Sequence, residues 1–317
     1  PAAPEQRRRA LAGALGVAFT LLFLVVLLAG MQRLERTQTR IRFSLLVHFI
    51  LRGALVATFI STLLEMLWMM LLGYITTESP VRHMWLQKAG DLRELPLGPF
   101  LLFNSATSLF GAGCEELVKL WLLTVCTDLL PASRSAAGTL EHYHSSLCGI
   151  QSCCSCRALL ESPRALALAG VALGLGFMVS ENTGYMAAAA LEDNWSVVWF
   201  VELVRTLVNM HWVLTGLSAA RLAVKLGLCP QAPAAGEPLL EVGLPSLGAL
   251  LTSVWPAVCA HTIWNFTMTC LTWRGVEGEA ALQLWAEVLA PTLSFSFLGC
   301  LYVAMVVLLW RNWPSAN

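Results

Sequence analysis

Long apolar runs separated by short polar segments make up most of this chain. A helix of about 20 apolar residues is long enough to cross the hydrocarbon core of a bilayer. Seven runs reach this length, at residues 10–30, 43–75, 97–130, 164–191, 196–228, 243–273 and 281–310. The second and third are long enough to be tilted or broken, and Gly111 and Gly113 could split the third. The pattern predicts an all-α fold, a polytopic transmembrane bundle of about seven to eight helices.

The composition favours the same class. Of the 317 residues, 57% are hydrophobic and 13% are charged, whereas soluble domains carry about 25% charged residues. The 20 Lys and Arg balance the 20 Asp and Glu, so net charge does not favour a nucleic-acid partner. We therefore expect a multi-pass integral membrane protein whose surroundings are membrane lipids.

Three regions can be distinguished along the chain. Residues 1–96 hold N-terminal transmembrane helices and loops with no recognised motif, and residues 274–317 hold a C-terminal transmembrane helix. Residues 97–273 form a core that carries every motif below, with a Cys-rich loop inserted at 131–163. If that loop is cytosolic, its thiols are candidates for palmitoylation; a variable loop without such a role is the alternative. The thiols concerned are Cys153, Cys154 and Cys156.

The first polar group lies within the third apolar run and reads Glu115-Glu116-x-x-Lys119. A charge at the centre of a bilayer costs about 2.5–3.5 kcal/mol on insertion scales, so each one needs a reason. Glu115 and Lys119 are four residues apart with the acid first, which is the favourable order for a helical ion pair. Such a pair accounts for one glutamate and leaves the other as a candidate for chemistry.

The second group reads Phe177-x3-Glu181-Asn182-x2-Tyr185. Glu181 and Tyr185 share a helix face, and Asn182 adds an amide beside them. The structural alternative places Glu181 near a helix end, where it reaches the lipid headgroups. Glycines upstream predict close helix packing; they are Gly170, Gly174 and Gly176.

The third group is Arg205, Asn209 and His211. Arg205 and Asn209 stack at i, i+4, whereas His211 points to a neighbouring face. A lone intramembrane histidine is as often a packing or hydrogen-bonding residue as a functional one.

The fourth group pairs His261 with Asn265 on one helix face, five residues after Pro256. The proline should free backbone groups and open the helix locally. An imidazole with a carboxamide four residues on could bind an oxyanion.

Two further acids lie in apolar runs without such company. Glu65 is surrounded by Leu and Met, and we interpret it as a packing feature or a contact for a partner protein. Glu202 lies three residues before Arg205 and would neutralise it.

Taken in order, these four motifs resemble the PrsW protease family, which is related to the CAAX prenyl endoproteases and the bacterial CPBP proteins. The resemblance covers residues 105–270 and implies an intramembrane endopeptidase acting on membrane-protein substrates. It implies that Glu115 or Glu116 is the general base that activates a water and that His211 assists it. His261 and Asn265 would then stabilise the oxyanion. The supporting residues would be Lys119, Asn182, Tyr185, Arg205 and Asn209.

The resemblance leaves the role of a metal open. Glu181 stands where CAAX endoproteases have histidine, so its own role is undecided. The PrsW family is classed as metallopeptidase, which implies Zn²⁺ ligands at Glu115, Glu181, His211 and His261. No His-Glu-x-x-His motif is present, and the alternative is a metal-free glutamate mechanism of the CAAX type, which the sequence slightly favours. The cofactor is therefore either Zn²⁺ or none.

Two functions from other classes compete with the protease. The same superfamily resembles the multi-helix scaffold subunit of γ-secretase, in which intramembrane histidines serve assembly. A scaffold has little use for two adjacent glutamates beside Lys119, so the motifs favour an enzyme. Buried Glu, His and Arg also build proton relays in transporters, but the sequence lacks repeated halves with matching broken helices.

Overall fold

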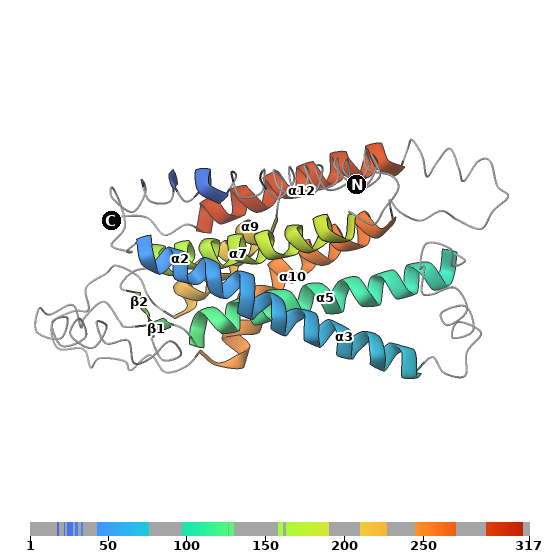
Figure 1. Ribbon diagram of the computed structural model, residues 1–317, viewed down its shortest axis with the longest axis horizontal. Coiled ribbons are helices and arrows are strands. Elements are labelled where there is room, and N and C mark those ends of the chain that lie inside the picture. The colour runs from blue at the N-terminus through green and yellow to red at the C-terminus, as the bar shows by residue number, and fades with distance from the viewer. Residues whose placement is uncertain are drawn as a thin grey trace, which may run out of the picture.

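The computed structural model describes residues 43–75, 97–125, 127–129, 158–160, 163–189, 210–226, 245–270 and 290–312, together with single positions between 18 and 33. Within these ranges the chain folds into helices apart from two three-residue strands, so the all-α prediction is confirmed (Figure 1). The helices are α2 (Phe43–Arg52), η1 (Gly53–Ala57), α3 (Thr58–Ile75), α5 (Leu97–Val125), α7 (Pro163–Ala189), α9 (Met210–Lys225), α10 (Leu247–Cys270) and α12 (Ala290–Asn312).

The strands β1 (Thr127–Leu129) and β2 (Ala158–Leu160) form a short parallel pair. They bring the end of α5 close to the start of α7. Of the Cys-rich loop at 131–163, the structure describes only β2 and Pro163, the first residue of α7.

Most predicted runs correspond to helices. The 43–75 run is one continuous helix in which η1, a π-helical turn, joins α2 to α3. The expected break at Gly111 and Gly113 is wrong, because α5 runs unbroken from Leu97 to Val125. A helix can continue through both glycines, because a single glycine costs it only about 1 kcal/mol. Most of the 10–30 run lies outside the described residues.

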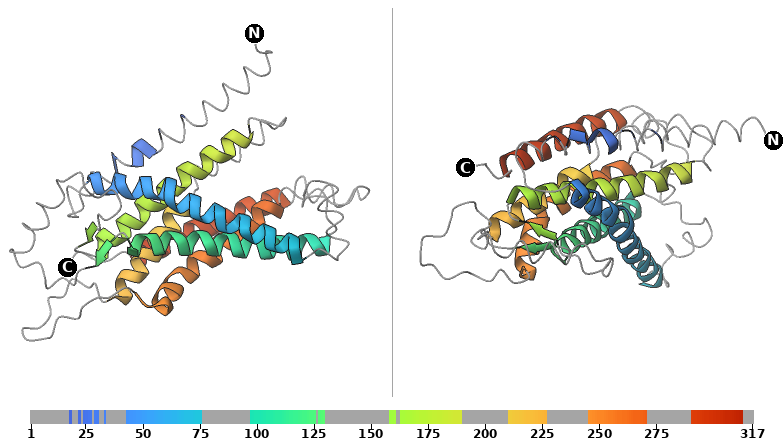
Figure 2. Two further views of the ribbon diagram at one scale, coloured as in Figure 1. Left: turned by 60° about the horizontal axis from the view of Figure 1, so that its bottom comes forward. Right: turned by 60° about the vertical axis from the view of Figure 1, so that its left-hand side comes forward.

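Helix α7 is the centre of the bundle. It packs against α9 on one side and against α2 and η1 on the other, and Figure 2 shows it crossing between them. Glycines make both contacts close, as the sequence predicted. A Cβ on Gly174 would lie 2.5 Å from the carbonyl oxygen of His211, and one on Gly176 would lie 1.9 Å from that of Ile50.

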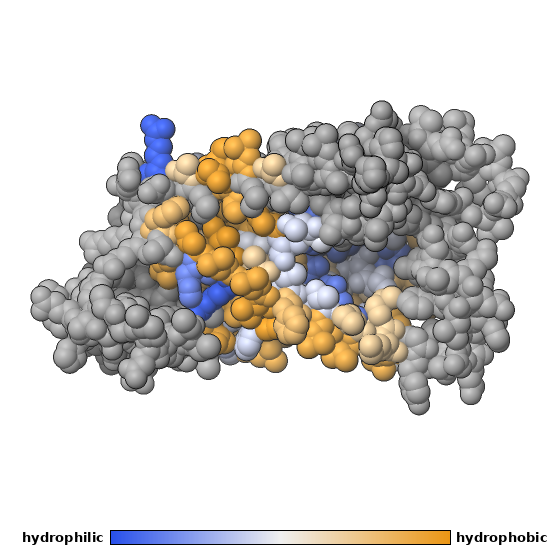
Figure 3. Space-filling view, in the orientation of Figure 1, coloured by the Kyte–Doolittle hydropathy of each residue, from blue (hydrophilic) through white to orange (hydrophobic). Residues whose placement is uncertain are grey.

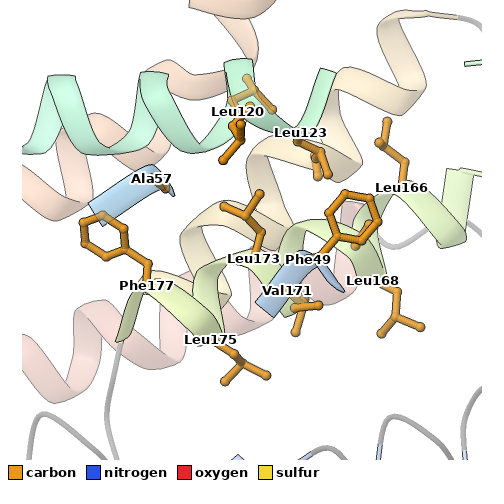
Figure 4. Packing of buried hydrophobic residues seen from close by; sticks show 14 of the residues in the cluster. Phe49, Ala57, Leu120, Leu123, Leu166, Leu168, Val171, Leu173, Leu175 and Phe177 are labelled. Atoms are coloured by element: carbon orange, nitrogen blue, oxygen red, sulfur yellow. The ribbon is translucent and has the colours of Figure 1, made fainter. Parts of the chain in front are cut away.

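The apolar core fills the space between these helices. Side chains of α2, α5 and α7 meet there, among them Phe49, Leu123 and Leu173, each fully buried (Figure 4). Helix α12 lies on the far side of the bundle from α3 and α5 and packs on α9 and α10 (Figures 1 and 2).

Pro256 lies inside α10, and the helix continues through it. Because proline has no N–H, the carbonyl of Thr252 four residues earlier loses its helical partner. The side chain of Arg221 on α9 donates to this carbonyl from Nη2 at 3.3 Å, and Lys225 donates to the Thr252 hydroxyl. The predicted release of a backbone group is thus observed, and α9 supplies its new partner.

The outer surface matches a lipid environment. Among the residues that the structure describes, three helical segments are long and apolar enough to cross a membrane: Leu45–Leu72, Arg164–Gly184 and Leu247–Cys270. Large apolar side chains such as Leu55 and Phe59 are more than 65% exposed, which a soluble protein would rarely tolerate over so large an area. In the coloured part of Figure 3 most of the surface is apolar, while hydrophilic residues lie toward its left edge and in a recess near the middle.

Candidate active site

Six ionisable side chains from four helices meet inside the bundle. Helix α5 contributes Glu115, Glu116 and Lys119, while the other three helices contribute one side chain each. Glu181 comes from α7, His211 from the first turn of α9 and His261 from the middle of α10. Helix α5 can present three polar groups to one point because positions three and four apart lie on the same helix face.

Lys119 lies at the centre of the cluster and its side chain is fully buried. Its Nζ lies 2.6 Å from Glu116 Oε1, 3.1 Å from His211 Nδ1 and 3.7 Å from Glu115 Oε2. The ring of Phe177 lies 4.3 Å away and adds a cation–π contact. Lys119 therefore contacts both glutamates, and the nearer one is Glu116 at i, i+3 rather than the expected Glu115.

His211 is held by two partners of opposite character. Its Nε2 lies 2.5 Å from Glu181 Oε2, and its Nδ1 faces Lys119. Because an ammonium can only donate, Nδ1 accepts from Lys119, and Nε2 carries the hydrogen that it donates to Glu181. The tautomer of His211 thus follows from its neighbours, with the Nδ1 lone pair directed into the cluster.

His261 has a similar arrangement. Its Nδ1 donates to Glu116 Oε1 at 3.0 Å, and its Nε2 lies 3.8 Å from Glu115 Oε2. The two imidazoles are 5.0 Å apart and nearly perpendicular. Each histidine therefore gives one N–H to a carboxylate and directs its other nitrogen toward Glu115.

The cluster has the donor set of a metal site. Ligand atoms of Glu115, Glu116, His211 and His261 all lie within 4.8 Å of one another, and all four residues are buried. Glu115 Oε2 lies 3.7 Å from His211 Nδ1 and 3.8 Å from His261 Nε2. Zinc bonds of 2.0–2.1 Å at tetrahedral angles place ligand atoms about 3.4 Å apart, so each of these two pairs is a few tenths of an ångström wider than a zinc site needs.

Two buried oxygens support this fit. Oε2 of Glu115 and Oε2 of Glu116 have no hydrogen-bond partner, and a buried carboxylate oxygen without a partner is costly. A cation at the centre would satisfy Glu115 Oε2. The group of residues that could hold a metal contains Glu116 where the sequence resemblance implied Glu181, and Glu181 instead contacts the group through His211.

Glu65 on α3 also lies at this cluster, so its interpretation as a packing or partner residue is wrong. Its carboxyl interacts with that of Glu115 and electrostatically with Glu181 and Lys119. One signal could have found it, namely an acid within an apolar run. Its partner lies 50 positions away in the sequence, however, so no local spacing reveals the contact.

The other predicted site residues are less closely tied to the cluster. Asn182 is fully buried on α7 beside Glu181. Asn265 is half-buried one turn beyond His261, and its backbone carbonyl accepts from Thr269. The remaining ones fall outside the described residues or, for Tyr185, have an undescribed side chain; they are Tyr185, Arg205, Asn209, Glu202, Cys153, Cys154 and Cys156.

The fold and the cluster define a helical integral membrane protein with a buried centre of carboxylates, imidazoles and one lysine. Residues 42–308 match the PrsW-protease family, described as the PrsW family of intramembrane metalloproteases. The chain belongs to this family and is an intramembrane protease. The match is wider than the 105–270 segment that carries the motifs, and it includes α2, η1 and α3. No curated protein and no solved structure matches the chain.

Proposed function

We propose that this protein is a metal-dependent endopeptidase that hydrolyses peptide bonds of membrane-associated substrates. Glu115, His211 and His261 would hold a divalent cation such as Zn²⁺, and Glu116 would be the general base. The observation that carries the proposal is the convergence of Glu115 Oε2, His211 Nδ1 and His261 Nε2, with separations of 3.7 and 3.8 Å from the carboxylate oxygen. Two histidines and one glutamate are a known ligand set of zinc peptidases.

The carboxylates around the imidazoles support this assignment. Glu181 accepts the Nε2–H of His211, and Glu116 accepts the Nδ1–H of His261. Histidines that bind zinc usually donate their other N–H to a carboxylate, which fixes the ring orientation and makes the ligand nitrogen more basic. His211 and His261 both have such a carboxylate partner without a metal.

A bound zinc ion would polarise the scissile carbonyl and lower the pKa of a bound water to near neutrality. The protein itself contributes the base and the positioning. Glu116 uses Oε1 for Lys119 and His261 and keeps Oε2 unpaired, so Oε2 is available to accept the proton of an attacking water. Asn265, on the His261 face of α10, is the proposed amide donor to the oxyanion.

Access to the centre is proposed from the side of Glu181. Its side chain is 20% exposed, whereas those of Lys119 and Glu116 are 0% exposed. Water and an unwound substrate segment need such an opening, because an extended peptide has unpaired backbone groups that lipid cannot satisfy.

One observation favours the metal-free alternative. Lys119 donates to His211 Nδ1 at 3.1 Å, so the lone pair that would hold a metal is already engaged. Binding of a metal there requires Lys119 to give up His211 and keep Glu116. In the metal-free mechanism Lys119 stays in place as the cation of the site and a glutamate activates the water alone.

The test is a cleavage assay with matched metal analysis. Purified protein in detergent is given a panel of single-span membrane substrates, with and without a chelator, beside Glu116→Gln and His211→Ala. We expect about one zinc per chain and loss of cleavage on chelation. Glu116→Gln should keep zinc and lose at least about 100-fold in rate, because it removes the general base. His211→Ala should lose the zinc as well.

The matched control is His48→Ala, which removes an imidazole from α2 outside the cluster and should change neither readout. Cleavage by both site variants at the rate of the wild type would refute the proposed centre. Cleavage that survives chelation, in protein without metal, would establish the glutamate mechanism instead. A folded protein that binds no metal and cleaves no substrate would favour the scaffold or transporter alternatives.

A further inference from the structure

Glu65 reaches the centre from a helix that carries none of the recognised motifs. Its Oε1 lies 3.5 Å from the position that a Cβ on Gly111 would take, so it contacts α5 one turn before Glu115. Its carboxyl interacts with that of Glu115, which lies one turn further along the same face of α5. One turn further along α3, the ring of Trp68 stacks on that of Phe110 at 4.2 Å and 9°. The contact between α3 and α5 thus places the Glu65 carboxyl against Glu115.

The π-helical turn η1 sets the direction of Glu65. A π turn holds one residue more than an α turn, and each residue of an α-helix adds about 100° of rotation. The hydroxyl and the amide of Thr58 both bond to the Gly53 carbonyl, five residues earlier, which is the π spacing. After this turn, the residues that face the interior of the bundle recur every four positions. They are Ala57 and Ser61, which are both buried, and then Glu65.

Packing alone does not explain an acid at this position. A carboxylate in a membrane span costs about 2.5–3.5 kcal/mol, and the flanking residues Leu64 and Met66 show that apolar side chains suit this helix. The groups that act on Glu65 include two other acids of the cluster, Glu115 and Glu181. Adhesion between α3 and α5 needs no acid, so an acid at this position is explained better by a role at the centre.

We propose that Glu65 is a positioning residue of the metal centre. It holds the Glu115 carboxyl from the α3 side and so keeps Glu115 Oε2 facing His211 and His261. Carboxylates that bind metals are themselves hydrogen-bonded by neighbours, and removing such a partner typically costs 10- to 100-fold in metal affinity. This inference rests on the proposed function, because it assigns a role to Glu65 at the centre described there.

Three variants of the full chain test it. Glu65→Leu removes the carboxyl and introduces an apolar side chain suited to lipid. Glu65→Gln can still donate an amide N–H to Glu115. Thr62→Ala removes a polar group from an exposed position of the same helix, and is the control. The first readout is the zinc dissociation constant, measured by competition with a chelator. The second readout is the pair of kinetic constants kcat and KM, each determined separately.

We expect Glu65→Leu to bind zinc about 10- to 100-fold more weakly and to lose kcat with little change in KM, because Glu65 does not contact the substrate. Glu65→Gln should recover most of the affinity, and Thr62→Ala should match the wild type. A folded Glu65→Leu protein with unchanged zinc affinity and kcat would overturn the inference.

A second measurement does not depend on metal or activity. Unfolding midpoints of metal-free protein are compared in a double-mutant cycle of Glu65→Leu with Glu115→Gln, beside a control cycle of Thr62→Ala with Glu115→Gln. Residues in contact give non-additive effects, whereas separate ones add. We expect coupling in the first cycle and additivity in the second.

The two measurements separate the possible failures. If the wild type binds no zinc and cleaves nothing, the proposed function fails, and the cycle alone decides whether Glu65 holds Glu115. Additivity in that cycle overturns the inference whatever the zinc result. Coupling together with weakened zinc binding supports it.

Discussion

Gly174→Ala offers a direct way to disturb the centre without changing any residue in it. An added Cβ would lie 2.5 Å from the carbonyl oxygen of His211 and 2.7 Å from the Cα of Trp212, where ordinary contact begins at 3.4 Å. Both neighbours are backbone, so α9 must retreat from α7 by about 0.9 Å. The hydrogen bond of 2.5 Å between His211 Nε2 and Glu181 Oε2 would then open to about 3.4 Å, which is beyond a normal hydrogen bond.

A displacement of about 1 Å can cost 10²-fold in rate, which corresponds to about 2.7 kcal/mol of transition-state stabilisation. We therefore expect Gly174→Ala to lower kcat/KM for the best substrate of the panel about 100-fold. Gly184→Ala is the control, because it lies on the same helix and its Cβ would meet nothing within 4 Å. Both changes raise helix propensity equally, by about 1 kcal/mol. Equal activity in the two variants, with both folded, would refute the idea that α7–α9 spacing sets the geometry of the centre.

Two further changes test the packing that supports the site. Gly176→Ala, whose Cβ would lie 1.9 Å from the Ile50 carbonyl oxygen, should lower the free energy of unfolding by about 2 kcal/mol. Thermal unfolding in detergent measures this loss. A midpoint equal to that of Gly113→Ala would contradict the prediction. Asn104→Leu removes a buried amide that donates to the Phe266 carbonyl at 3.0 Å, so the free energy of unfolding should fall by about 1–3 kcal/mol. Zinc affinity should not change, and a large loss of affinity would show that this contact shapes the centre as well.

The location of the site could be predicted from the sequence because ionisable residues are conspicuous in apolar helices. Glu115, Glu116, His211 and His261 each stood out in this way, and the structure brings them together. Their pairing could not be predicted. Helical spacing favoured the Glu115–Lys119 pair at i, i+4, but the approach of α9 and α10 draws Lys119 toward His211 and leaves Glu116 as its nearest acid.

Two other features depended on contacts that sequence spacing does not encode. Pro256 predicted a freed carbonyl on α10. The residue that donates to this carbonyl, Arg221, belongs to another helix and showed no local signal. Glu65 was misread because its direction depends on the π turn at Gly53–Ala57, and no residue pattern marked that turn. In both cases the missing information was the rotation and depth of one helix relative to another.

The polar face of α5 has a consequence for how the protein is made. Helix α5 is not among the three segments that are long and apolar enough to cross a membrane by themselves, and its charged groups would each cost about 2.5–3.5 kcal/mol on entering lipid alone. Lys119 and Glu116 pair with each other within α5, but their other partners, His211 and His261, are synthesised 92 and 145 residues later. The buried polar centre can therefore be completed only after α9 and α10 have been made, when most of the chain has already left the ribosome.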